Sequence, residues 1–420
     1  MHNRQVVTFE IGGCGIAVAN DFWSQMISEH GLQIVDGGIA ARESTNDSLS
    51  GVSVFFDESR SGVYSPRTIC CDLTSEGTGK LSRGRLLPYY DNKSLVFSNE
   101  GSGNCYAKAF HIEGLPVAQQ SMNRFRRIVE ACDSLQGVRF IHSLSGGTGS
   151  GLTGLLIRSV YDYLDAGSKC LIYSACVPPS NHTPDTCLST YNTLLGLQDL
   201  IECSHMVFPY DNDAVLRQSK TTNCKSPNPF IAECLSGITA SMRFPGLVNA
   251  DLRKIYSNCV LFKNMHFLVS AFAKNMKSVH ELAHQVFERN SATMSCDLLG
   301  DRERFLASFM AFRGKCIPMS RVHESIKSLQ LEDQSTVSAS LCSQPVVTDK
   351  GFIPAALTCV HNTTAISQFF NTVLRSFDAQ FSSRSHVYLY EENGLQRTEL
   401  EHARNLVSSV SDLYREHQRN

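Results

Sequence analysis

A run of small residues, Ser145-Gly-Gly-Thr-Gly-Ser-Gly151, constrains the fold of this chain more than any other feature. It lies between an apolar stretch at residues 138–144, which predicts a strand, and apolar residues at helical spacing over residues 152–164. Glycines let a backbone turn sharply and bring its N–H groups close to a ligand, and a helix N-terminus favours a bound anion. The run therefore predicts a phosphate-binding loop. Backbone N–H groups would hold the phosphate, because no Gly-Lys-Ser/Thr follows.

Two other interpretations of the run remain open. The spacing Gly149-x-Gly151-x-x-Gly154 matches a dinucleotide fingerprint, which would indicate an NAD-linked oxidoreductase. That fingerprint requires an acidic residue at the end of the next strand to bind a ribose. Here the next predicted strand, residues 170–177, continues into two prolines and has no acid at its end. The run could also be a glycine-rich turn that binds no ligand.

Two further glycine turns precede predicted helices in the first 155 residues. Gly12-Gly-Cys-Gly15 is predicted as a tight turn between a buried strand at residues 5–11 and a helix that runs to about residue 30. Glu100-Gly-Ser-Gly-Asn104 precedes another helical stretch. Because one such turn is common and three are not, we expect a single ligand wrapped by several loops of one sheet.

The order of the predicted elements indicates an α/β protein with more than one domain. Strands alternate with helices to about residue 205, which predicts a mainly parallel, doubly wound sheet. A short strand is expected at residues 52–56 within a surface loop. A second α/β region follows, with strands near residues 260–272, 309–315 and 352–360, and residues 363–420 are expected to be largely helical.

Composition argues against several classes of function. The formal net charge of −2 gives no electrostatic reason to expect nucleic acid or an anionic membrane as a partner. No apolar run reaches transmembrane length and the N-terminus has no signal-peptide pattern, so we expect a cytoplasmic protein. The 16 cysteines include no Cys-x-x-Cys pair, so we expect reduced thiols rather than a zinc site.

The glycine run resembles the signature loop of tubulins and their bacterial relatives, and the likeness extends over nearly the whole chain. The matching motifs are Gly12-x-Cys14-Gly15, Phe22-Trp23, Gly101-Ser-Gly-Asn104, Leu135-Gln136-Gly137, Arg243-Phe-Pro-Gly246, Asn249-Ala-Asp-Leu-Arg-Lys254 and Phe312-Arg-Gly314. The resemblance implies a tubulin-like three-layer fold with a GTPase domain, a central helix, a smaller α/β intermediate domain and C-terminal helices. The expected boundaries are residues 1–210, 211–245, 246–362 and 363–420.

The same resemblance implies GTP or GDP as the ligand, with magnesium as a further candidate, and longitudinal contacts with other tubulin-fold subunits. Gly146, Gly147, Thr148 and Gly149 would hold the phosphates, and Asp185 would lie near the ribose. Asn212 and Asn228 would recognise guanine, for which an amide suits because it carries both a donor and an acceptor. The other expected nucleotide contacts are Gly12, Gly13, Cys14, Asp72, Gly101, Ser102, Gly103, Asn104 and Ser143.

Several positions depart from the family's pattern around the nucleotide. Gly13 stands in place of a glutamine, and Cys224 in place of the aromatic residue that stacks on guanine. Thr74 replaces an acid linked to magnesium, for which Glu76 is the candidate substitute. These departures predict weaker nucleotide binding, and they leave a pseudo-GTPase scaffold as an alternative.

The family also uses a loop of one subunit to complete the nucleotide site of the next. Here that loop has the sequence Asn249-Ala-Asp251-Leu-Arg-Lys254. In the members that promote hydrolysis, an acid on this loop orients the attacking water, and its position here resembles Lys254. We therefore expect weak or no self-activated GTP hydrolysis, and we assign no catalytic residue.

Two further departures bear on assembly. The segment that joins neighbouring protofilaments sideways in α and β tubulins is several residues shorter here, over residues 273–278. The chain ends at residues 416–420 without the acidic tail of α and β tubulins. We therefore expect a divergent tubulin of delta, epsilon or zeta type in a centriole, basal body or similar structure. A polymerising GTPase that forms or caps protofilaments is the alternative.

Overall fold

The structure is a computed structural model of the 420-residue chain. It describes residues 4–35, 38–42, 49, 51–74, 79, 90–164, 168–180, 186–219, 226–244, 246–274, 276, 278–315, 317–329, 335–344, 346–348 and 351–418. Three positions named in the sequence predictions, Glu76, Asp185 and Cys224, lie outside these residues.

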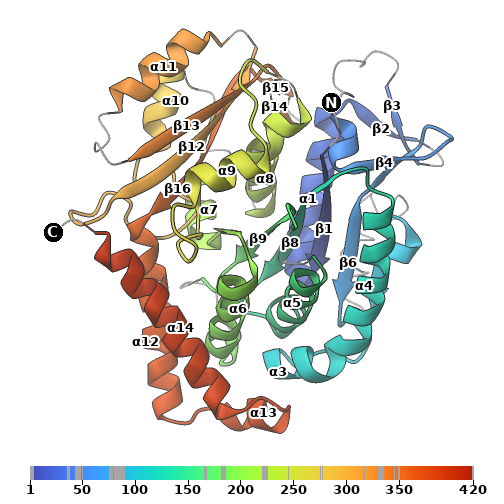
Figure 1. Ribbon diagram of the computed structural model, residues 1–420, viewed down its shortest axis with the longest axis vertical. Coiled ribbons are helices and arrows are strands. Elements are labelled where there is room, and N and C mark those ends of the chain that lie inside the picture. The colour runs from blue at the N-terminus through green and yellow to red at the C-terminus, as the bar shows by residue number, and fades with distance from the viewer. Residues whose placement is uncertain are drawn as a thin grey trace.

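A six-stranded parallel sheet in the order β10-β9-β8-β1-β6-β7 is the largest sheet among the described residues (Figure 1). Its neighbouring strands all run parallel, as the sequence predicts. Chain order reverses between β1 and β8, because β6 and β7 follow on one side of β1 while β9 and β10 follow on the other. The strands are β1 (Gln5–Ile11), β6 (Thr68–Asp72), β7 (Leu95–Phe97), β8 (Leu135–Ser143), β9 (Leu171–Val177) and β10 (Met206–Pro209).

Both faces of this sheet are covered, so its strands are buried along nearly their whole length. Val7 and Phe9 of β1 pack on one face of the sheet, and Val6 packs on the other. The first face carries α4 (Gly114–Glu130), α5 (Thr153–Tyr163) and α6 (Ser189–Cys203). The opposite face carries α1 (Gly12–Glu29) and α8 (Asn228–Arg243). The expected α/β architecture of layered helices around a mainly parallel sheet is thereby confirmed.

A second sheet, in the order β11-β16-β12-β13, lies beyond α8 (Figure 1). It joins β11 (Val269–Lys274), β16 (Ala355–Thr363), β12 (Phe305–Gly314) and β13 (Thr336–Cys342). Helices α10 (Val279–Gln285) and α11 (Met319–Ser328) pack against one of its faces. Helix α9 (Leu252–Cys259) precedes it, and α7 (Asn212–Ser219) precedes α8.

The remaining elements extend these layers. Helices α12 (Ser367–Ser382), α13 (Val387–Glu392) and α14 (Arg397–Glu416) pack beside α6, so the helical end of the chain is as predicted. Short segments complete the fold: β2 (Leu32–Val35), β3 (Gly38–Ala41), β4 (Phe56–Glu58), β5 (Tyr64–Pro66), β14 (Val346–Thr348), β15 (Gly351–Ile353) and α3 (Tyr106–Lys108). Among the described residues, none of the helices combines the length and apolar character that crossing a bilayer requires. The four-part domain division stays a prediction.

Two predicted strands are wrong or shortened. The strand expected at residues 52–56 is instead a 3₁₀ turn at Val52–Val54. The Arg67 guanidinium donates hydrogen bonds to the carbonyls of Ser53 and Val54, which are then not available to a neighbouring strand. The strand expected from residue 260 begins at residue 269, because the chain first makes a turn in which the N–H of Met265 donates to Phe262. The tight turn expected at residues 12–15 is instead the first turn of α1.

A fully buried carboxylate connects the two sheets through α1 and α8. Glu29, the last residue of α1, accepts hydrogen bonds from Arg243 of α8 at 2.7 Å and from Arg313 of β12 at 3.0 Å. The Ser236 hydroxyl donates to the same carboxylate at 2.7 Å. Burial by itself would raise the pKa of Glu29, but the charges of Arg313 and Arg243 outweigh it and hold this pKa well below its ordinary value.

Replacing Glu29 by glutamine is expected to destabilise the protein strongly. An amide cannot neutralise two buried guanidinium groups, and removing one partner of a buried ion pair costs about 3–5 kcal/mol. Urea unfolding at pH 7 measures the free energy of unfolding. Because the folded-state pKa of Glu29 is lowered, its stabilisation is present above the unfolded-state pKa and is lost only in strong acid.

The matched control is Glu324→Gln. Glu324 pairs with Arg321 at the surface, where the two side chains are 65% and 70% exposed. Such pairs contribute about 0–1 kcal/mol. A Glu29→Gln variant as stable as this control would contradict the structural role of the buried cluster.

Candidate functional site

The first glycine turn and the glycine run lie against each other at the carboxyl edge of the parallel sheet. Gly12 follows β1 and has a φ of 69°, in the left-handed region that favours glycine. A Cβ atom on Gly12 would lie 3.5 Å from the nitrogen of Gly149 and 3.6 Å from Cγ2 of Thr148. The contact therefore spans β1 and β8, where chain order reverses and where ligands bind in open parallel sheets.

The third glycine turn packs against the same run. The N–H of Gly147 donates to Oδ1 of Asn104 at 3.0 Å, and the hydroxyls of Ser102 and Thr148 lie 3.3 Å apart. A Cβ atom on Gly147 would lie 2.5 Å from the nitrogen of Cys105, which is closer than side-chain atoms approach a backbone. Glycine is therefore required at position 147 for the two loops to meet.

Positive φ angles shape the third turn. Gly101, Gly103 and Asn104 have φ values of 68°, 57° and 57°. Asparagine is among the few non-glycine residues that adopt this conformation routinely. The turn is also joined to the end of β6, because the N–H of Gly101 donates to the carbonyl of Leu73 at 2.8 Å.

A histidine that the sequence analysis did not single out supports the run from below. Nδ1 of His142 donates to the carbonyl of Gly149 at 2.8 Å, and Nε2 lies 2.7 Å from the Ser174 hydroxyl. Burial lowers the pKa of His142 to about 4, so the ring is neutral. We assign its one proton to Nδ1, because the Gly149 carbonyl beside that atom can only accept. Ser143 also lies beneath, since a Cβ atom on Gly149 would come within 2.4 Å of its Oγ.

A buried asparagine holds the loops in register. Nδ2 of Asn192, in α6, donates to the carbonyls of Asn104 at 2.8 Å and of Ser145 at 2.9 Å. Its Oδ1 accepts from the N–H of Tyr106 at 2.9 Å and from the hydroxyl of Tyr390 at 2.7 Å. The sequence predictions missed this residue, because Asn192 lies among other polar side chains at the start of α6 and carries no distinctive local signal.

Helix N-termini converge on the space beside these turns. Helix α1 begins at Gly12, the π-helical turn η5 (Thr148–Leu152) begins within the glycine run, and α3 begins after the third turn. Within the described part of the chain, no side chain caps the starts of α1 and η5, whereas the first N–H of α3, that of Tyr106, donates to Oδ1 of Asn192. Their N–H groups and positive dipole ends suit an anion such as phosphate.

Asp72 and Thr74 lie next to the third turn. Asp72 ends β6 and is buried, and its Oδ1 accepts from the N–H of Thr74 at 3.3 Å. A Cβ atom on Gly101 would lie 3.7 Å from Cγ2 of Thr74. Over the residues that the structure describes, no three histidine, cysteine, aspartate or glutamate side chains group to hold a metal ion. A magnesium ion does not need such a set, because it keeps several waters and binds through one or two carboxylates and phosphates.

The remaining predicted contacts lie around the same edge. Gly13 and Cys14 are in the first turn of α1, and Asn212, the first residue of α7, follows the carboxyl end of β10. Asn228 is the first residue of α8. In the described residues no hydrogen bond joins Asn212 or Asn228 to the glycine turns, so their roles stay predictions.

The loop at residues 246–254 lies at the opposite end of the sheet. Asp251 caps α9 by accepting from the N–H of Lys254 at 2.8 Å, and it pairs with Arg4 just before β1. The Lys254 ammonium donates to the carbonyl of Asn249 at 3.3 Å. Since β1 is parallel to its neighbours, this loop lies at the amino ends of the strands and the glycine turns lie at the carboxyl ends.

The later glycines of the apparent dinucleotide fingerprint have packing roles. A Cβ atom on Gly151 would lie 2.4 Å from the carbonyl oxygen of Tyr106. One on Gly154 would lie 2.0 Å from Oδ2 of Asp199. Because these two glycines bring η5 and α5 close to α3 and α6, their spacing needs no dinucleotide to explain it.

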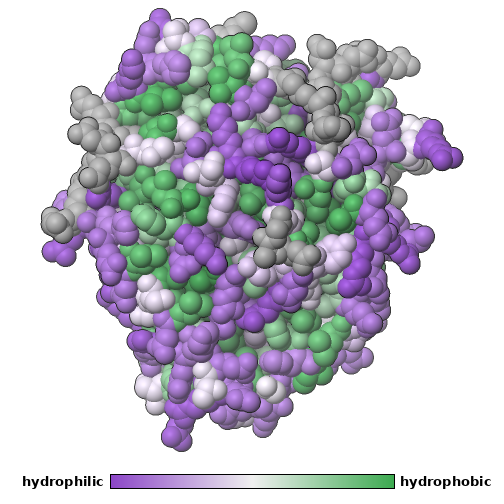
Figure 2. Space-filling model, viewed as in Figure 1, coloured by the Kyte–Doolittle hydropathy of each residue, from purple (hydrophilic) through white to green (hydrophobic). Residues whose placement is uncertain are grey.

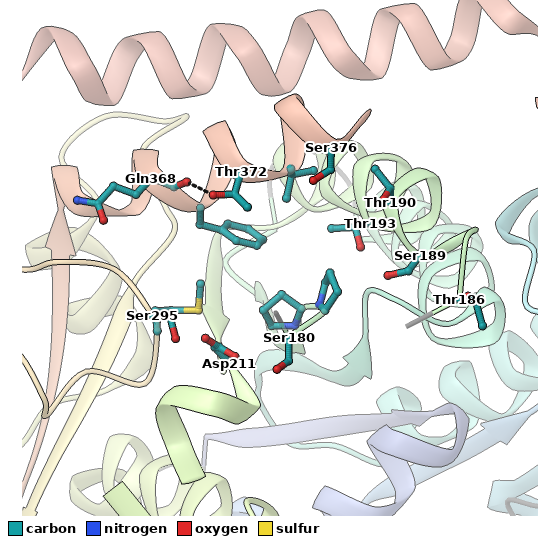
Figure 3. Close-up of a pocket in the computed structure, with 15 residues that line it drawn as sticks. Ser180, Thr186, Ser189, Thr190, Thr193, Asp211, Ser295, Gln368, Thr372 and Ser376 are labelled. Atoms are coloured by element: carbon teal, nitrogen blue, oxygen red, sulfur yellow. Dashed lines mark hydrogen bonds between the residues drawn. The ribbon is translucent and has the colours of Figure 1, made fainter. Parts of the chain in front are cut away.

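A cavity of about 320 Å³ lies at the carboxyl ends of β9 and β10 (Figure 3). Its wall carries many hydroxyl groups, the carboxylate of Asp211, and the apolar side chains of Phe369 and Val373 from α12. Thr186 connects it to the third glycine turn, because the Asn104 amide donates to its hydroxyl. Of the predicted site residues that the structure describes, none lines this cavity.

The chain matches a family model described as "Tubulin/FtsZ family, GTPase domain" over residues 5–220. It is 32% identical to the tubulin beta-1 chain of Homo sapiens over 441 residues, which cover 99% of this chain and 94% of that protein. It is also 32% identical to the tubulin beta-6 chain of Gallus gallus (99% and 95% covered). The tubulin beta chain of Trichophyton rubrum is 31% identical, with the same coverage.

A buried acid below the first glycine turn was not predicted. Glu10 of β1 accepts hydrogen bonds from Nε1 of Trp23 and from the hydroxyl of Thr68, both at 2.6 Å. The hydroxyl of Tyr90 lies 3.3 Å from its second oxygen. Burial raises the pKa of Glu10 to about 7, although these hydrogen bonds and the charge of Arg139 act in the other direction.

Glu10 is expected to make the protein less stable as the pH rises towards 7. The folded state keeps the proton up to about pH 7, whereas the unfolded chain loses it near 4.5. Stability therefore falls by about 3 kcal/mol over that interval. Glu10→Gln should flatten this dependence in urea unfolding at pH 5 and pH 8. An unchanged difference between the two pH values would contradict the assignment, and Glu324→Gln is the surface control.

Proposed function

This chain belongs to the Tubulin/FtsZ family, and on that premise we propose that it binds GTP or GDP in its glycine turns and acts in a specialised microtubule-organising structure. The observation that carries the nucleotide proposal is the meeting of the turns that follow β1, β7 and β8. They come together at the switch point of the sheet, where uncapped helix N-termini supply N–H donors.

The residues present fit a nucleoside phosphate. The backbone of residues 146–149 would bind the phosphates, and Ser143, Ser102 and Asn104 would hold that backbone in place. The remaining phosphate contacts would come from Gly12, Gly13, Cys14, Gly101 and Gly103. Asp185 would contact the ribose, and Asn212 and Asn228 would contact guanine, in line with the resemblance. A magnesium ion would lie near Asp72, with Thr74 or Glu76 beside it.

The two ends of the molecule suit head-to-tail assembly with other tubulin-fold subunits. The glycine turns lie at one end of the parallel sheet, and the loop of residues 246–254 lies at the other. A heterologous contact between unlike ends builds a linear array. Leu247 is 78% exposed at the loop end, as an apolar interface residue would be before association. On the face shown in Figure 2, by contrast, hydrophobic residues form separate groups among hydrophilic ones.

Hydrolysis by this chain alone is proposed to be weak or absent. Lys254 occupies the position where an acid would orient water in a neighbouring site, and its ammonium group donates within its own loop to Asn249. Asp251 is engaged with Arg4 and with the N-terminus of α9. Position 254 therefore carries no carboxylate, and the carboxylate of Asp251 is already engaged within this chain.

A divergent class of tubulin, of delta, epsilon or zeta type, is the proposal for its place in the family. The shortened segment at residues 273–278 supports it, because a short connection between β11 and α10 cannot make the lateral reach of α and β tubulins. A cytoplasmic location at a centriole or basal body follows from that class. The alternative is a polymerising GTPase that forms or caps protofilaments.

Gly147→Ala is expected to reduce nucleotide binding at least tenfold. The added Cβ would push the third turn away from the run and disrupt the N–H array that the phosphates need. Native mass spectrometry of the gently purified chain measures the bound nucleotide, and GTP titration measures its affinity. We expect one guanine nucleotide per chain in the unmodified protein.

Ser150→Ala is the control, because the Ser150 hydroxyl donates to carbonyls of its own run, those of Gly146 and Gly147, and forms no hydrogen bond to the other two turns among the described residues. Circular dichroism checks that each variant is folded. A folded, unmodified chain that is empty and takes up no GTP would contradict the proposal.

Hydrolysis is measured as phosphate release in the same preparations. We expect slow release that Lys254→Ala leaves unchanged. Rapid release that this substitution abolishes would contradict the hydrolysis proposal.

The tagged chain, expressed at its natural level, is expected to label centrioles or basal bodies in immunofluorescence. Uniform labelling along all microtubules would contradict a specialised role. Filaments that pellet with GTP and are visible by electron microscopy would favour the polymerising alternative. Both measurements are independent of the nucleotide assay.

A further inference from the structure

Helix α10 carries a motif that the proposed function does not use, His280-Glu-Leu-Ala-His284. A separation of four residues places both histidines on the same helix face. Their Nε2 atoms lie 3.2 Å apart, and the ring centroids lie 4.2 Å apart. His280 is exposed and His284 is half-buried, so the pair is open to solvent.

The distance between the ring nitrogens matches a shared metal ion. Zinc binds histidine nitrogen at about 2.0–2.1 Å in tetrahedral geometry. Two nitrogens on one such ion are therefore about 3.3 Å apart. The 3.2 Å separation of these atoms also permits one N–H···N hydrogen bond between neutral rings. A metal ion would replace that proton after the rings, whose centroids lie 4.2 Å apart, turn so that both Nε2 lone pairs point at it.

The surroundings hold the two rings in place. Leu282 and Ala283 are fully buried, which fixes the face of α10 that carries the histidines. Ser278 caps the helix by accepting from the N–H of Glu281 at 3.1 Å. The Ser328 hydroxyl of α11 lies 3.2 Å from Nε2 of His284 and could hydrogen-bond a water on the ion. Such a supporting shell favours binding, because it limits the rearrangement that coordination requires.

A metallopeptidase centre is not what this geometry supports, although the sequence matches H-E-x-x-H. A catalytic zinc has three protein ligands. Across the part of the chain that the structure describes, no third histidine, cysteine, aspartate or glutamate joins the pair. The coordination positions left open would be filled by water.

We propose that His280 and His284 form a surface binding site for a zinc ion. Imidazole is a good ligand for late first-row metals, zinc among them. The site is distinct from the glycine turns, since it lies on a helix that packs against the second sheet. It does not depend on the nucleotide proposal.

Isothermal titration of the full chain with Zn²⁺, in the presence of Mg²⁺ and GDP, tests this site. We expect the unmodified chain to bind one Zn²⁺ ion more than His280→Asn/His284→Asn, and each single variant to bind that ion at least tenfold more weakly. The cysteines are the same in every variant, so the difference isolates the pair. His402→Asn, an exposed histidine on α14, should leave binding unchanged.

NMR of histidine labelled with ¹⁵N gives a second measurement, in which Zn²⁺ should shift the Nε2 signals of both residues. Because His280 is exposed and His284 is half-buried, both substitutions should leave the fold intact, as circular dichroism can verify. Equal zinc stoichiometry and affinity in the unmodified chain and the double variant would overturn the proposal. So would unshifted Nε2 signals at saturating zinc.

Discussion

Close backbone contact at the carboxyl edge of the parallel sheet is the constraint on which the rest of this structure depends. Gly147 must approach Cys105, and Gly149 must approach Ser143, at distances that exclude any side chain. These contacts bring helix N-termini to one place, so that N–H groups rather than charged side chains define the site. The polar residues around them, Asn104, His142 and Asn192, use their hydrogen bonds to hold backbone atoms in position.

Helix α1 connects that site to the second sheet. It begins at Gly12, against the glycine run, and ends at Glu29, within a buried cluster with Arg243 and Arg313. Arg243 lies directly before the loop of residues 246–254, which is at the far end of the strands from the glycine turns. These elements therefore connect the glycine turns with the loop of residues 246–254, and the buried charges make their separation costly.

The sequence predicted the elements that have strong local signals. The strand at residues 5–11 and the apolar face of the helix after it are as expected, because burial on both sheet faces and helical spacing leave clear patterns. The helical turn at Gly12, the 3₁₀ turn at Val52–Val54 and the late start of β11 were missed. The first two follow from residues distant in the chain, namely Gly149 against Gly12 and the Arg67 guanidinium on residues 53 and 54. The late start of β11 follows from a turn at residues 262–265 that its apolar sequence does not reveal.

The sequence by itself determined the parallel α/β class, the glycine positions, the family and a set of candidate contacts, because glycine spacing and apolar periodicity are local properties of a chain. Only the tertiary structure decided that the glycine turns meet at one switch point and that Asn192 links two of them. It also revealed that Glu10 lies buried and that His280 faces His284. Those features depend on which residues distant in the chain become neighbours, and burial and distance set their chemistry.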